Sequence, residues 1–173
     1  LYTEASEAIK EHSAGVMNAV RDRAFEDFRR QGFPTRKVER YKYTDMEKIF
    51  APNYGLNINR IEFPVDPYAA FRCDVPNLST LLYFVVNDAF YTKRLPNVQP
   101  EEGVVIGSLR KAAEEHPELI ARYYARIAKT EEDAITALNT MLAQDGLLIY
   151  VPKNVQMEKC VQIINILRAD VSM

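Results

Sequence analysis

The most reactive side chains in this 173-residue chain belong to two cysteines and two histidines. Cys160 follows Lys159, and a neighbouring ammonium favours the thiolate that would accept sulphur or a metal. An inert role for this cysteine is favoured, because free cysteines beside apolar strands are usually packing residues. Neither Cys73 nor His12 nor His116 has a partner at the spacing of a metal motif. The sequence therefore predicts no metal site and no disulfide framework.

Other chemistry-bearing patterns are equally weak. The chain contains neither a GxxxxGK[ST] loop nor a GxGxxG turn, so no nucleotide site is assigned. The acidic clusters at residues 114–115 and 131–133 resemble paired catalytic carboxylates, but both fall at expected helix ends, where surface charge is usual. His116 precedes Pro117, and we expect it to cap a helix. No catalytic, cofactor-binding or metal-binding residue is predicted, and the chain is not expected to be an enzyme.

The basic and aromatic connector at residues 36–43, RKVERYKY, has the residue types that contact phosphates and stack on bases of single-stranded nucleic acid. The formal net charge is -2, from 22 basic and 24 acidic residues, so the chain has no net positive field for nucleic acid or an anionic membrane. We favour the interpretation that Tyr41 and Tyr43 fold back on the first helix. Nucleic acid and membrane are not expected partners.

An amphipathic helix is predicted over residues 3–30, because apolar side chains recur on one face at steps of seven and four: Ile9, Val16, Val20, Ala24 and Phe28. This face packs on its own domain or in a partner's groove, and the first interpretation is favoured. Gly32 and Pro34 end the helix. Residues 44–47 have the spacing of a capping box with Thr44 as the cap, which predicts a second, short helix from Asp45.

Strand signals follow in the middle of the chain. Residues 51–76 are interrupted by prolines and predict irregular structure with one strand at 58–63. The run TLLYFVV at residues 80–86 and residues 89–95 surround a short polar turn and predict a hairpin. A short buried strand is expected at residues 103–106.

Three short helices are predicted next, over residues 109–115, 117–128 and 131–144. Ser108 is expected to cap the first of them, and Thr130 is expected to cap the third. Helices and strands occur in separate runs rather than in strict alternation. The predicted fold class is therefore α+β.

The last part of the chain changes character after Gly146. Residues 147–151 and 161–167 predict two strands, and their spacing suits one coil of a parallel β-helix as well as a hairpin. The predicted domains are an N-terminal α+β region, residues 1–145, and the start of a further domain, residues 146–173. Because the chain begins with Leu and stops directly after a strand-like run, we expect a fragment of a longer protein.

Two motifs resemble a known family. The run through Arg21, Ala24, Phe28, Gly32, Pro34, Lys37, Glu39 and Tyr41-Lys42-Tyr43-Thr44 is similar to the N-terminal signature of the SufD branch of the SufB/SufD family. Residues 145–155, DGLLIYVPKNV, with the strand QIINI at 162–166, resemble the entry into that family's right-handed parallel β-helix. The two motifs bracket nearly the whole chain in the expected order. Departures are Tyr41, where Trp is usual, and Cys160, where Pro is common.

The resemblance implies a function that the residues alone do not. It implies a non-enzymatic, cytoplasmic scaffold subunit of the SUF iron–sulphur cluster assembly complex, acting with a SufB-like subunit and a SufC-like ATPase. It also implies a cluster in the full complex but no cofactor in this span, because the family's SufC-binding segment and cluster-related residues lie beyond Met173. The alternatives are a small-molecule enzyme or binding module with a pocket between the hairpin and the three helices, or a nucleic-acid binder using Lys37 and Lys42.

Overall fold

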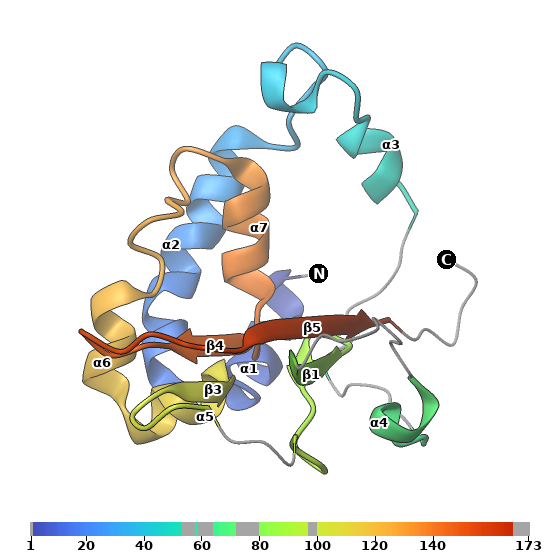
Figure 1. Cartoon of the computed structure of the whole chain (residues 1–173). Coiled ribbons are helices and arrows are strands. Elements are labelled where there is room, and N and C mark those ends of the chain that lie inside the picture. The colour runs from blue at the N-terminus through green and yellow to red at the C-terminus, as the bar shows by residue number, and fades with distance from the viewer. Residues whose placement is uncertain (1, 53–57, 59–63, 72–79, 97–99, 168–173) are drawn as a thin grey trace. The chain divides into compact units, whose positions relative to one another are not determined.

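Separate runs of helical and strand-forming sequence give an α+β structure, described here by a computed structural model (Figure 1). It describes residues 2–52, 58, 64–71, 80–96 and 100–167. The helices are α1 (Tyr2–Glu11), α2 (Gly15–Gln31), the 3-10 helix η1 (Glu39–Tyr41), α3 (Met46–Phe50), α4 (Pro67–Ala70), α5 (Leu109–Glu115), α6 (Pro117–Tyr123) and α7 (Ala134–Leu142). The strands are β1 (Thr80–Val86), β2 (Ala89–Phe90), β3 (Val105–Ser108), β4 (Leu147–Tyr150) and β5 (Cys160–Ile166).

Two compact units share these elements. The first comprises the described residues up to Ile58 together with Ala113–Gln144, and the second comprises those within Asn59–Ala112 and Asp145–Ser172. The division predicted from the sequence, at residue 145 with a β-helix beginning after it, stays a prediction.

The predicted first helix is two helices, so its expected continuity is wrong. Ala14 has extended backbone angles and separates α1 from α2. The Asn18 amide donates to the carbonyl of Lys10 at 3.0 Å, so a side chain of α2 satisfies a carbonyl near the end of α1. The Ser13 hydroxyl accepts a hydrogen bond from Arg21 at 2.9 Å. These polar contacts explain why the chain leaves the helix at residues 12–14.

The end of α2 is where the sequence places it. Gly32 has φ 64°, a left-handed conformation that glycine adopts readily, and its N–H donates to the Phe28 carbonyl at 2.8 Å. Phe33 then packs edge-on against Phe28 and stacks on Phe50 of α3, with ring centroids 4.9 Å apart in the second pair. The short helix α3 is confirmed, but its cap is Asp45, which accepts from the Lys48 N–H, and not Thr44.

The core of the first unit lies between α1, α2 and α7. In Figure 1, α2 and α7 lie side by side, so the apolar face of α2 packs within its own unit. The buried core residues are Tyr2, Ile9, Ala24 and Met141, with Ala5, Phe25, Phe28, Ile58, Leu138 and Leu142 packed against them. The buried stripe of α2 is Met17, Arg21, Ala24 and Asp27, whereas Val16 and Val20 are only partly buried. The buried face of α2 is therefore rotated relative to the predicted apolar face. The observed face contains two charged residues, Arg21 and Asp27.

The second unit contains two small sheets. Strand β1 pairs in parallel with β5, from Thr80 opposite Cys160 to Val86 opposite Ile166, and antiparallel with β2. Strands β3 and β4 form a separate antiparallel pair. Leu81, Tyr83 and Phe90 are the buried centre of a cluster that Ile106, Leu147, Met157 and Val161 complete. Apolar side chains from both sheets thus share one core.

Several sequence predictions hold in this unit, and others need correction. Strand β1 has its predicted bounds, and the turn at Asn87 and Asp88 has the two positive φ angles that a tight hairpin needs. The returning strand β2 is much shorter than the predicted 89–95. The hairpin alternative for the last two strands is wrong, because β4 pairs with β3 whereas β5 pairs with β1. The strand predicted at 58–63 lies almost wholly outside the described residues, and the sequence did not predict α4.

Helix caps show why predicted boundaries shift by a few residues. Helix α5 has its predicted bounds, and Ser108 caps it by accepting from the Lys111 N–H at 3.1 Å. Helix α6 ends at Tyr123 instead of residue 128, and the side chain of His116 forms no capping hydrogen bond. Helix α7 is capped by Asp133 and not by Thr130. The cap predicted at Ser108 is therefore confirmed, and the cap predicted at Thr130 is wrong.

Candidate functional site

A buried arginine joins α2 to the end of α7. The Arg21 side chain is fully buried, and its guanidinium donates to the carbonyls of Met141 and Ala143, both at 2.7 Å. It also bonds Ser13 and Asn18. The last carbonyls of a helix lack partners within it and carry partial negative charge, so a cation with several donors suits this position. Arg21 therefore holds three segments of the first unit together.

Burial has electrostatic consequences around this guanidinium. Loss of solvation lowers the pKa of Arg21 below its usual value, while Tyr124, Tyr2 and Asp22 act in the opposite direction. Burial and the neighbouring carboxylate of Asp22 raise the pKa of Tyr2 to about 12, and burial raises the pKa of Tyr124. Both tyrosines stay neutral at physiological pH. The arginine is the charged centre of this cluster.

The connector, residues 36–43, is fixed to the start of α7. The Tyr41 hydroxyl donates to Asp133 at 2.8 Å, and the Arg40 guanidinium donates to the same carboxylate at 2.6 Å. Asp133 in turn accepts from the N–H groups of Ile135 and Thr136, at 2.8 and 2.9 Å. One carboxylate thus caps a helix and anchors a connector that lies more than 90 residues earlier in the chain.

The charge state of Asp133 follows from these donors. Burial alone would raise the pKa of its carboxyl group, but hydrogen bonds from Thr136, Tyr41, Arg40 and Ile135 hold that pKa below its usual value. Burial and the bond to Asp133 raise the pKa of Tyr41. The anchor therefore consists of a carboxylate and a neutral phenol at physiological pH.

The two connector tyrosines have different environments. Tyr41 is half-buried against α7, as anchoring requires, but Tyr43 is 90% exposed. The expectation that both rings fold back on the first helix is therefore wrong. Lys42 lies 5.1 Å from the Tyr43 ring centroid and pairs with Glu39, while Arg36 pairs with Asp45. Neighbouring carboxylates thus neutralise much of the connector's basic charge, which weakens the nucleic-acid interpretation.

We expect Tyr41→Phe to lower the free energy of unfolding by about 1 kcal/mol, because it removes one hydrogen bond to a carboxylate and keeps the ring. Urea titration followed by circular dichroism measures this effect, since the chain has no tryptophan. Tyr43→Phe is the matched control and should leave stability unchanged. Equal losses in the two variants would contradict the anchoring role of Tyr41.

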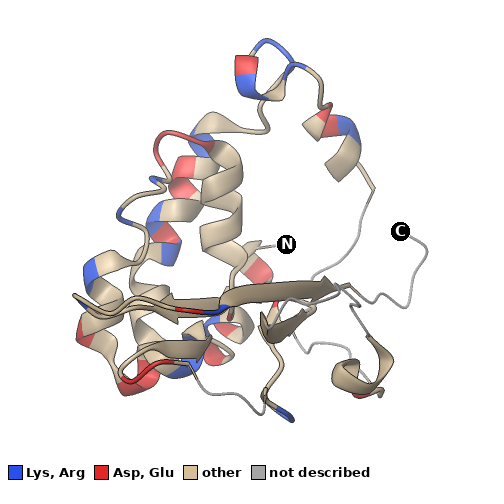
Figure 2. Ribbon diagram, viewed as in Figure 1, with Lys and Arg blue, Asp and Glu red and all other residues tan. Residues whose placement is uncertain are grey.

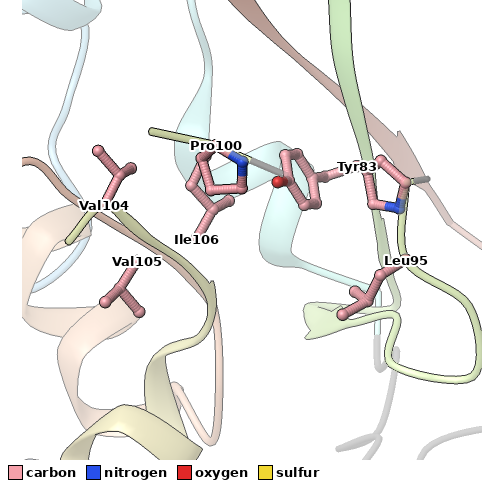
Figure 3. Close-up of a pocket in the computed structure, with 7 residues that line it drawn as sticks. Tyr83, Leu95, Pro100, Val104, Val105 and Ile106 are labelled. Atoms are coloured by element: carbon pink, nitrogen blue, oxygen red, sulfur yellow. The ribbon is translucent and has the colours of Figure 1, made fainter. Parts of the chain in front are cut away.

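A pocket in the second unit is lined mainly by residues with apolar side chains. It encloses about 190 Å³, and its lining residues are Tyr83, Leu95, Pro96, Pro100, Val104, Val105 and Ile106. Figure 3 shows the Tyr83 ring among these side chains, with its hydroxyl on the side where Pro100 and Ile106 lie. Burial raises the pKa of Tyr83. Tyr83 is the titratable side chain of this lining, so the pocket lacks the convergent acid–base groups that the enzyme interpretation needs.

The candidate residues from the sequence have separate environments within the two units. Cys160 is exposed at the start of β5, which makes the predicted packing role wrong, and Cys73 lies outside the described residues. His12 Nδ1 lies 2.9 Å from the Ala8 carbonyl within the first unit. Among the described residues, no three His, Cys, Asp or Glu side chains lie close enough to hold a metal ion. In the same residues, no helix is long and apolar enough to cross a bilayer.

The sequence reasoning missed two residues that organise the first unit. Arg21 is not part of the apolar face predicted for the first helix, and the sequence places Asp133 only in an acidic cluster at a helix end. One signal was present for Arg21, since its steps to Met17 and Ala24 are those of a buried helical stripe. No sequence signal pairs Asp133 with Tyr41.

These observations define an α+β protein whose first unit is held by buried polar anchors between helices. The chain belongs to the SufBD family, because the family described as "SufBD protein N-terminal region" matches residues 1–163. It is 30% identical over 127 residues to the iron-sulfur cluster assembly protein SufD of Bacillus subtilis, a match that covers 73% of this chain and 28% of the relative. The family resemblance seen in the sequence is thereby confirmed.

Shorter matches agree with this assignment. The SufBD family protein ABCI9 of Arabidopsis thaliana is 35% identical over 75 residues, which cover 40% of this chain and 16% of the relative. The SufBD family protein slr0074 of Synechocystis is 34% identical over 56 residues, which cover 32% and 12%. The matches therefore span 28% or less of the length of these relatives. No solved structure matches the chain. Its relatives carry names in iron–sulphur cluster assembly, which supports a role in that process.

Proposed function

We propose that this chain is the N-terminal part of a SufD-like scaffold subunit in the SUF assembly complex. The observation that carries the proposal is the family match over residues 1–163. The subunit acts in the cytoplasm with a SufB-like subunit and a SufC-like ATPase. The iron–sulphur cluster is the product that the full complex assembles and passes on, and this span contributes structure and interaction surface rather than catalysis.

The internal organisation of the first unit supports this proposal. Two of its polar side chains, Arg21 and Asp133, form several hydrogen bonds each, and these bonds are made to helix ends and to the connector. Groups engaged in this way stabilise a fold and are not available to bind substrate. The right-handed β-helix that the resemblance implies would begin after residue 145, and it belongs to the same proposal.

We expect the protein, tagged and expressed at its natural length, to co-purify with the SufB-like subunit and the SufC-like ATPase under reducing conditions with ATP. Residues 1–173 alone are the matched control and should recover less ATPase, because the resemblance places the ATPase-binding segment further along the chain. Mass spectrometry of the eluted proteins measures both. Recovery of neither partner with the natural-length protein would overturn the proposal.

A further inference from the structure

The loop between α6 and α7, residues 124–133, presents an unusual surface. Ile127 is 89% exposed and Tyr123, at the end of α6, is 54% exposed. A large aliphatic side chain left almost fully in water gives up the stabilisation that burial would provide. Such residues are normal when they are scattered, but these two are close in sequence and share a basic surrounding.

The segment that contains these side chains is basic. Residues 119–130 contain Arg122, Arg126 and Lys129 and no acidic residue. Lys129 pairs with Glu132, whereas neither arginine forms an ion pair with any other described residue. In Figure 2, basic residues follow α6 and the loop, and the acidic residues of the loop gather near α7. Tyr123 and Ile127 are therefore each preceded in sequence by an arginine with no ion pair to a described residue, and the Arg122 guanidinium lies 5.4 Å from the Tyr123 ring centroid.

Both ends of the loop are held in place. Thr130 is buried, donates to Asp27 at 2.6 Å and accepts from Gln31 at 2.8 Å. At the other end, Ala125 has φ 54°, a left-handed conformation that disfavours residues with a Cβ atom. Strain of this kind persists where the surrounding structure imposes it. Ile127 thus lies on a loop whose two ends have defined positions.

We propose that Ile127 and Tyr123, flanked by Arg122 and Arg126, form a docking surface for a partner protein with an apolar pocket bordered by carboxylates. Tyrosine and arginine are enriched among the residues that dominate binding energy at protein interfaces. Carboxylates on the partner would complement the two guanidinium groups and favour the correct orientation. This inference goes beyond the proposed function, because it defines a partner by its surface chemistry and does not depend on the scaffold role.

An anionic membrane fits this surface less well. Interfacial helices bind lipid through an apolar face that is free, but Ile120, an apolar residue of α6, is buried in the first unit. The exposed apolar side chains of this surface are Ile127 and part of Tyr123. The whole chain carries a formal charge of -2. A small apolar anchor of this kind is buried more completely in a protein pocket than at a lipid surface.

The test begins with a photo-crosslinking residue. In one variant of the full protein, expressed in its own cells, p-benzoylphenylalanine replaces the exposed Ala128. In the control variant, it replaces the exposed Glu7. Mass spectrometry identifies the protein that is crosslinked from position 128 and not from position 7. That protein is then produced in pure form, and calorimetry measures its affinity for the unmodified chain and its variants.

Ile127→Asp should weaken binding by at least about tenfold, and Arg126→Glu should weaken it and reduce its salt dependence. Ile49→Asp is the matched control, because Ile49 is also exposed, at 47%, but lies in α3. It should leave the affinity unchanged. Unaltered urea midpoints would show that all three variants fold.

Four results would overturn the proposal. In the crosslinking experiment, they are the lack of a crosslink specific to position 128 and crosslinks only between copies of this chain. In calorimetry, it is an affinity that does not respond to Ile127→Asp. In vesicle binding, it is binding to phosphatidylcholine–phosphatidylglycerol vesicles that Ile127→Asp abolishes.

Discussion

Arg21→Met is expected to lower the free energy of unfolding by about 3 to 4 kcal/mol. The change keeps an unbranched side chain about as long as the arginine stem but removes every donor. The buried carbonyl of Met141 and the partly buried carbonyl of Ala143 then lose a charged partner at 2.7 Å, and an unsatisfied buried group costs about 1 to 3 kcal/mol. Relief from burying a cation offsets part of this loss.

Urea unfolding followed by circular dichroism measures the change, and hydrogen exchange locates it. Amide protection should fall first in α7, whose last carbonyls Arg21 holds. Arg21→Lys should lose about 2 kcal/mol, because one ammonium cannot reach both carbonyls and Ser13 in the same geometry. Arg23→Met is the matched control, since that side chain is 71% exposed and its closer ion pair, at 3.4 Å, is to the partly exposed Glu131. Equal losses at positions 21 and 23 would refute the role of Arg21.

Local signals in the sequence were sufficient for elements that their own residues determine. The β-branched and aromatic run of β1, the left-handed Gly32 and the Ser108 cap all lie where the sequence indicates. Each depends on contacts within a few residues, so propensity and turn chemistry describe it well.

What the sequence could not provide depends on distant partners. Strand β5 pairs with a strand 80 residues earlier, and no local pattern encodes that choice. Arg21 is a buried residue because carbonyls about 120 positions later approach it. From sequence alone a charge on a helix is correctly assigned to the surface in most cases. The break between α1 and α2 has the same origin, because Ser13 leaves the helix to meet this arginine.

The candidate binding surfaces also depend on contacts that local sequence does not show. The sequence singled out the connector for its Lys and Tyr residues, but Tyr41 and Arg40 serve an internal anchor, and neighbouring carboxylates pair with Arg36 and Lys42. The exposed Ile127 lies in a segment that was predicted as helix through residue 128. Since helix α6 ends at Tyr123, this side chain is not on a buried face.

Asp133→Ala is expected to lower the free energy of unfolding by about 3 kcal/mol at neutral pH. The substitution removes the cap of α7, worth about 1 to 2 kcal/mol, together with the acceptor for the half-buried Tyr41. The Asp133 side chain is only 10% exposed, so water does not readily replace it. Asp133→Asn keeps a capping oxygen without the charge and should lose about half as much. Glu132→Ala, at a side chain that is 66% exposed, is the control and should have no measurable effect.

The pH dependence separates the charge of Asp133 from its shape. Because hydrogen bonds hold the folded pKa of this carboxyl group below its unfolded value, the group stabilises the fold fully above the unfolded pKa of about 4. That contribution is lost as the pH falls through the folded pKa, where the protonated acid no longer attracts Arg40 or accepts as strongly from Tyr41. The stability difference between the unmodified chain and Asp133→Asn should therefore be constant near neutrality and shrink below about pH 4. Urea titrations across this range measure it. A difference that grows on acidification would mean that the folded pKa of Asp133 lies above its unfolded value, so that the folded state favours the protonated acid. The connector would then need another anchor.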